Sequence, residues 1–155
     1  MEKYLRLLNP KTTNYESTGG GNYGALTTQD VCIAISYAKL STVQSHLVNL
    51  YVLSQNSIDQ IKLSTKVIHT ELNKKNESSS TEDNEISLFI ALVEMCKVPA
   101  NYKSSVRNRA VIGGVSKDRV QRNLNRIINN YKSMLSDEIE RAFSKVEYQI
   151  NKNSS

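Results

Sequence analysis

The chain has 155 residues, which is the usual size of one compact domain and excludes a large enzyme fold. Hydrophobic residues make up 39% of the chain and Trp is absent, so the core must consist mostly of Leu, Ile and Val. Lys and Arg number 20 against 15 Asp and Glu, a formal charge of +5 that favours polyanionic partners. There is no run of 18 apolar residues, and the first ten residues are too polar for a signal peptide. We therefore expect a cytoplasmic protein without membrane association.

The start of the chain predicts an arm followed by a helix. Residues 1–25 hold the first proline and a glycine-rich cluster, so we expect a flexible N-terminal arm. Thr27 can cap a helix that has Asp30 in its first turn, and Leu26 can pack on Val31 as a hydrophobic staple.

Apolar residues at helical spacing predict the remaining elements. They indicate one helix, or two joined by a bend, up to residue 51 and another over residues 58–72. Residues 73–84 contain no apolar side chain, so we expect a polar loop there. Asn84 is then expected to cap a helix that ends near Pro99. Further helices are predicted over residues 101–112, 116–135 and 136–150, and a disordered tail over residues 151–155.

Every ordered segment has a period of 3.6 residues, and none alternates with a period of 2. The fold class is therefore predicted to be all-α. We expect a compact bundle of six or seven helices within one helical domain over residues 26–150.

The positive charge is concentrated in one segment. Between Lys97 and Lys132 there are nine basic residues and one acidic residue, Asp118. This segment has a formal charge of +8, and the remainder of the chain has −3. Such a one-signed block indicates an electrostatic footprint for nucleic acid, although a patch that only aids solubility is the alternative.

The same segment contains a helix-turn-helix-like pattern, which we place at residues 101–128. Ala110 is small where two helices approach closely, and Gly114 can adopt the positive φ of a tight turn. Ser116 can cap the second helix, which Val120 and Leu124 would anchor to the core.

The outward positions of this unit carry side chains that read nucleic acid. Arg can bind guanine through two hydrogen bonds, Asn and Gln can bind adenine, and all of them can bind phosphates. The candidate DNA-binding residues are Lys117, Arg119, Gln121, Arg122, Asn123 and Arg126, together with Arg107 and Arg109. Two positions depart from the usual pattern, because Gly113 and Asn123 stand where apolar residues are common. A helical hairpin with a solvated basic face is the structural alternative.

Catalytic and metal-binding patterns are absent from the sequence. His46 and His69 have no Cys or carboxylate partner at a ligand spacing, and we expect them to be packing or surface residues. Cys32 and Cys96 lie in apolar stretches, so we expect small buried hydrophobes rather than a disulfide. We therefore predict no catalytic residue, no metal, no cofactor and no enzymatic activity.

In its order of features, the chain resembles the late-gene antitermination Q proteins of lambdoid bacteriophages. The resemblance rests on Asn9-Pro10-Lys11 in the arm, on the spacing of apolar residues and Asp30 in residues 26–38, on the turn at residues 53–56, and on the C-terminal helix-turn-helix-like unit. The four-cysteine zinc finger of the lambda branch has no counterpart, since only Cys32 and Cys96 exist.

The resemblance implies a mechanism and partners. Members of this family bind a double-stranded DNA element at the phage late promoter, engage paused bacterial RNA polymerase with its sigma factor, and suppress pausing and termination in the host cell. The alternatives from other classes are a helix-turn-helix repressor or activator that acts as a dimer, and a basic helical inhibitor that binds an acidic protein or RNA.

Overall fold

The computed structural model describes residues 27–51, 56–75 and 82–153. All of the regular structure in these ranges is helical, which confirms the all-α prediction. The elements are α2 (Thr28–Tyr37), α3 (Thr42–Tyr51), α4 (Ile58–Lys75), α5 (Glu82–Cys96), α6 (Val106–Gly113), α7 (Lys117–Arg119), the π-helical turn η1 (Val120–Leu124) and α8 (Asn125–Asn153). The predicted arm, the Leu26 staple and part of the predicted polar loop lie outside the described residues.

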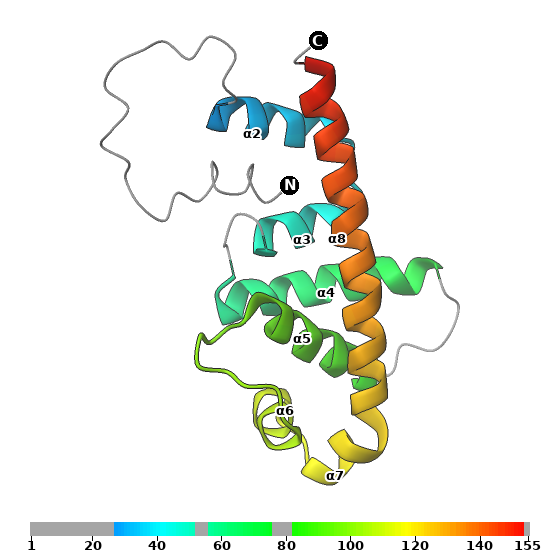
Figure 1. The fold of residues 1–155 in the computed structure, drawn as a ribbon. Coiled ribbons are helices and arrows are strands. Elements are labelled where there is room, and N and C mark those ends of the chain that lie inside the picture. Colours follow the sequence, from blue (N-terminus) through cyan, green and yellow to red (C-terminus); the bar gives the residue numbers. More distant parts are fainter. Residues whose placement is uncertain (1–26, 52–55, 76–81, 154–155) are drawn as a thin grey trace.

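The longest of the described helices, α8, runs along the molecule and contacts α2, α3 and α5 (Figure 1). Helices α2, α3 and α5 pack across it one after another, and α4 packs between α3 and α5. Helices α6 and α7 lie at the end where α8 begins, far from the C-terminus. Because α7, η1 and α8 follow one another without a break, the chain is helical from Lys117 to Asn153.

The prediction that a separate helix starts near Ser136 is wrong, because α8 runs through this position. Ser136 is exposed within α8, and the buried residues Leu135 and Ile139 on either side of it keep helical spacing. Since the apolar face continues through this position, Ser136 has no free helix end to cap. The helix also extends to Asn153, so the predicted tail at residues 151–155 begins too early.

Short side-chain caps set the starts of the first helices. The predicted cap at Thr27 is confirmed, because the Asp30 amide donates to Thr27 Oγ1 at 3.2 Å. The Thr27 amide also donates to Asp30 Oδ2 at 2.9 Å, which completes a capping box. The same reciprocal bonds join Ser41 to Gln44 before α3 and Ser57 to Gln60 before α4. The bend between α2 and α3 therefore separates two helices, which resolves the alternative that the sequence left open.

Other predicted boundaries need correction. Helix α4 extends to Lys75 and α5 begins at Glu82, so the polar segment is helical at both ends. Asn84 lies inside α5 and is not its cap. The short basic helix begins at Val106, since Ser105 is its N-cap and accepts the amide hydrogen of Asn108 at 3.1 Å.

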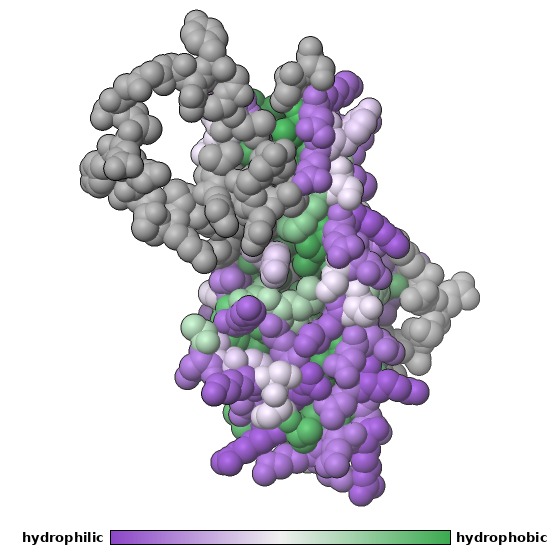
Figure 2. All heavy atoms as spheres, in the orientation of Figure 1, coloured by the Kyte–Doolittle hydropathy of each residue, from purple (hydrophilic) through white to green (hydrophobic). Residues whose placement is uncertain are grey.

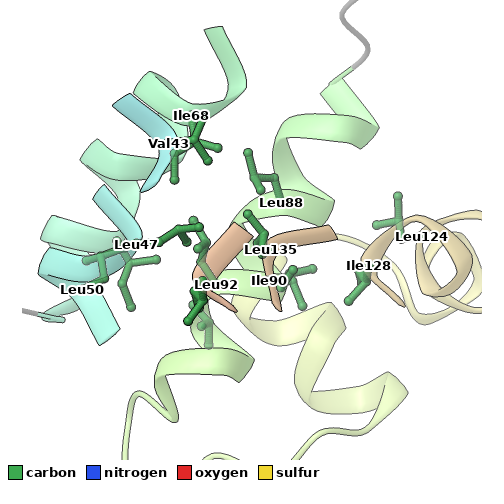
Figure 3. Close-up of a cluster of buried hydrophobic side chains, with 14 of the residues drawn as sticks. Val43, Leu47, Leu50, Ile68, Leu88, Ile90, Leu92, Leu124, Ile128 and Leu135 are labelled. Carbon is green, nitrogen blue, oxygen red and sulfur yellow. The ribbon is translucent and has the colours of Figure 1, made fainter. Parts of the chain in front are cut away.

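Two main apolar clusters lie along α8, besides the buried pair of Val48 and Ala142. The larger one joins α3, α4, α5, α6 and η1 to the first half of α8, and Figure 3 shows Leu47, Leu88, Leu92, Leu124 and Leu135 pointing into it. The smaller one joins α2 to the C-terminal half of α8, and it consists of Val31, Ala34, Ala38, Val146 and Ile150 with partly buried Ile35 and Leu40. Both clusters depend on α8, so this helix connects the two ends of the domain.

The cysteines and histidines have mixed outcomes. Both cysteines are free, but Cys32 is exposed on α2, so its predicted burial is wrong. Cys96 is partly buried, and its burial raises the pKa of the thiol to about 11. His46 Nδ1 lies 3.0 Å from Ser64 Oγ, and His69 is buried, which agrees with packing roles for both.

Candidate nucleic-acid interface

Helix α6, the turn at residues 114–116 and α7 form the helix-turn-helix-like unit. The positive φ predicted for Gly114 is confirmed at 65°, and the Gly114 amide donates to the carbonyl oxygens of Ala110 and Val111. Ser116 caps α7, because its Oγ accepts the amide hydrogen of Arg119 at 3.2 Å. Local sequence signals therefore fix both the end of the first helix and the start of the second.

Gly113 departs from the usual apolar pattern because α5 leaves no room for a side chain. A Cβ atom at this position would lie 2.9 Å from Ile90 Cδ1 and 3.2 Å from Ile86 Cγ2. Ile90 is fully buried and Ile86 is branched at Cβ, so neither neighbour can move away freely. The glycine lets α6 approach α5 closely.

The π-helical turn explains the second departure, at Asn123. In this turn the Asn125 amide donates to the carbonyl oxygen of Val120, five residues earlier. Val120, Leu124 and Ile128 are buried, while Asn123 is exposed. The turn therefore lets Val120, Leu124 and Ile128 share the core side, while Asn123 faces solvent.

A buried carboxylate on α5 holds this unit in place. Glu94 has a side chain that is only 3% exposed, and it accepts two hydrogen bonds from Arg109, from Nε at 2.7 Å and from Nη2 at 2.9 Å. Lys132 Nζ on α8 donates to the same carboxylate at 2.9 Å. Ser104 Oγ donates at 2.9 Å and the Tyr102 hydroxyl at 3.3 Å. We call these residues, together with Asn125, the Glu94 network.

Arg109 also connects the network to the π-helical turn. Its Nη1 donates to Asn125 Oδ1 at 2.8 Å, and Asn125 is the residue that closes the turn. The guanidinium therefore binds α5 on one side and the beginning of α8 on the other. The planar fork of Arg suits this task, since it can bind a carboxylate through two bonds and still donate elsewhere.

The network lowers the pKa of Glu94. Burial acts to raise the pKa, but hydrogen bonds from Arg109, Lys132 and Ser104, together with the Arg109 charge, lower it to about 2. Glu94 is therefore ionised at neutral pH. In turn, the hydrogen bond to Glu94 raises the pKa of Arg109, against the effect of burial.

These contacts remove Arg109 from the DNA-binding candidates, which corrects the sequence-based set. Its side chain is 10% exposed and its donors are occupied by Glu94, Asn125 and Ser104. The carboxylate that binds Arg109 is present in the sequence, but Glu94 lies 15 residues earlier and on a different helix, so no local pattern pairs the two. Positive charge alone did not distinguish a buried ion pair from a surface site.

Arg119 is also held by α5. Its Nε donates to Asp83 at 2.8 Å, and Nη2 lies 3.8 Å from Glu82. The side chain is 35% exposed. Arg119 therefore helps to fix α7 against α5, and acidic residues outside the basic block neutralise part of its charge.

The remaining candidates lie on the exposed side of the helical run that begins with α7. We define the polar face as the exposed residues Lys117, Gln121, Arg122, Asn123 and Arg126. Arg107 is exposed on α6. Within the ranges that the structure covers, Lys117, Arg126 and Arg107 have no ion-pair partner, and Arg122 pairs only with Asp118, at 2.9 Å and with 76% of its own side chain exposed.

Hydrophilic residues surround this face. In Figure 2 they cover the outer length of α8 and much of the end of the molecule at which α7 lies. Exposed ion pairs such as Arg122 with Asp118 are weak, so Arg122 can exchange this partner for a phosphate or a base edge. The arrangement is chemically suited to binding an anion of extended shape.

Other kinds of site are not apparent in the described parts of the chain. No group of three or more His, Cys, Asp or Glu residues there could hold a metal ion. None of the helices described is both long and apolar enough to cross a membrane. No family model, curated protein or solved structure matches the chain significantly.

We predict that Glu94→Gln lowers the free energy of unfolding by about 3–5 kcal/mol at pH 7, because Arg109 then carries a buried charge without its carboxylate. Urea denaturation at a series of pH values measures this effect. The folded-state pKa is below the ordinary value of 4.5, so the contribution of Glu94 is present above about pH 4.5 and is lost as the pH falls towards about 2. The difference between wild type and variant should shrink over the same range.

Asp118→Asn is the control, because it removes an exposed ion pair and should change the free energy of unfolding by no more than about 0.5 kcal/mol. A difference below about 1 kcal/mol for Glu94→Gln at pH 7 would contradict the structural role of the network.

We predict that Gly113→Val destabilises the protein by about 2 kcal/mol or more, because its side chain must enter the space held by Ile90 and Ile86. Gly114→Asn is the matched variant. No atom lies within 4 Å of a Cβ at that position, and Asn tolerates positive φ, so this change should cost less than about 1 kcal/mol. Thermal unfolding followed by circular dichroism compares the two, and equal losses would argue against the close contact of α6 with α5.

Proposed function

We propose that this protein binds double-stranded DNA through the polar face and Arg107. The observation that carries the proposal is that some cations of the basic block pair with carboxylates of α5, while others are left to solvent. Arg109, Arg119 and Lys132 are bound by carboxylates of α5, whereas Lys117, Arg122 and Arg126 are exposed along a single helical run. A rigid helix that presents cations and amides to solvent is what groove binding requires.

We further propose that the protein acts as a late-gene antiterminator in the cytoplasm of a host bacterium. The resemblance to the Q proteins supports this role, together with the location of the polar face at one end of an elongated domain. In this proposal the chain binds a DNA element at the late promoter and then joins the paused RNA polymerase and its sigma factor. In the same proposal, residues 101–114 connect the core directly to the helix-turn-helix-like unit, where the lambda branch has its finger.

Binding to DNA should be salt-dependent and should depend on individual cations of the polar face. We expect Lys117→Ala, Arg122→Ala and Arg126→Ala each to weaken binding to a mixed-sequence duplex. Each variant should also reduce the slope of log K against log salt by about 1, because one phosphate contact is lost. Fluorescence anisotropy over a series of salt concentrations measures both quantities.

Lys62→Ala is the matched control, since Lys62 is an exposed cation on α4 outside the basic block. It should leave the affinity and the slope unchanged. The proposal fails if the wild-type protein shows no salt-sensitive binding, or if Lys62→Ala weakens binding as much as Arg126→Ala does.

Transcription in vitro tests the proposed role directly. The template carries the late promoter from the genome that encodes this chain, followed by a terminator, and the reaction contains bacterial RNA polymerase with its sigma factor. We expect the protein to increase read-through several-fold, and replacement of the DNA element beside the promoter to abolish the increase. Blocked initiation without read-through would instead support a repressor.

A further inference from the structure

The segment between the buried residues Val120 and Ile128 is one residue longer than a regular α-helix requires. Within α8, residues Ile128, Leu135, Ile139, Ala142, Val146 and Ile150 follow the usual spacing. If α8 continued as a regular α-helix back to Val120, at about 100° per residue, the Val120 side chain would point about 80° away from the direction of Ile128. Val120 is nevertheless fully buried, because the π-helical turn rotates it back towards the core.

Removing one residue from the turn would restore the regular pattern. Val120 would then lie within about 20° of the direction of Ile128 in an uninterrupted α-helix, with Leu124 still on the buried side. The core therefore does not need the additional residue. The turn holds the additional residue among three exposed ones, Gln121, Arg122 and Asn123.

The Glu94 network contacts this turn through Asn125. Arg109 donates to Asn125 Oδ1 at 2.8 Å, and the Asn125 amide makes the bond to Val120 that defines the turn. A buried ion pair is thus connected to the widened part of the helix. π-helical turns of this kind occur often at functional sites, because they cost regular hydrogen bonding and need a compensating role.

We propose that the π-helical turn sets the DNA sequence preference of this protein, and that Asn123 is a specificity-determining residue. This inference rests on the proposed function of the polar face. Asn123 is an exposed residue of the turn and carries an amide, and the amide of Asn or Gln can bind the N6 and N7 edge of adenine through two hydrogen bonds. Lys117 and Arg126 bind phosphates on either side and fix the register of the helix.

Two variants of the full-length chain test the inference. Deletion of Asn123 should convert the turn into α-helix and leave thermal stability unchanged or higher. Asn123→Ala should keep the turn and remove only the amide. The probe is a pool of random-sequence duplexes, from which the wild-type protein selects a preferred sequence, and affinity for this sequence is compared with affinity for a mixed-sequence duplex.

Both variants should bind the mixed-sequence duplex with the wild-type salt slope, because the cations remain. The ratio of specific to mixed-sequence affinity should fall about tenfold or more, as expected for the loss of one bidentate base contact. Asn130→Ala is the control, since Asn130 is exposed on α8 beyond the turn, and it should leave the ratio unchanged.

The outcomes separate this inference from the proposed function. If the wild-type protein binds no duplex, the proposed function fails and this inference fails with it. If the wild-type protein selects a sequence and both variants select the same one with unchanged affinity ratios, DNA binding stands and the inference is overturned. Should the deletion variant not fold, Asn123→Ala alone decides between a loss of selectivity and none.

Discussion

The arrangement of α5, α6 and α8 depends on one buried carboxylate. A charged group removed from water is costly unless cations and hydrogen bonds compensate for it, and Glu94 receives both from residues on two other helices and the intervening connection. The compensation is available in a single geometry, in which Arg109 points from α6 towards α5 and Lys132 points from α8. The apolar cluster around it supplies most of the burial, while the ion pairs select the orientation.

This constraint divides the basic residues into two groups. Carboxylates of α5 bind Arg109, Arg119 and Lys132, so these residues contribute to the fold and less to the field outside it. The cations that face outwards keep their charge in water, where a polyanion can reach them. The formal charge of +8 in the sequence therefore overstates the charge offered to a ligand, and the acidic residues responsible lie before the basic segment begins.

Local signals could be predicted from the sequence, and long-range ones could not. The capping of α2 by Thr27, the positive φ of Gly114 and the cap at Ser116 depend on four or five neighbouring residues, and all three are confirmed. The burial of Arg109 depends on Glu94 in another helix, which no local pattern reveals. The π-helical turn was visible only as Asn123 in an unexpected position, since a period of 3.6 residues cannot represent an inserted residue.

The length of α8 has consequences for how the two ends of the protein can act together. Its 29 residues span about 43 Å at 1.5 Å per residue. Its first turns continue the polar face, and its last turns carry the cluster that binds α2. A chain bound to DNA through the polar face would hold α2 roughly 40 Å away along one continuous helix. Because a packed helix does not bend easily, the distance between the two ends is fixed by the fold.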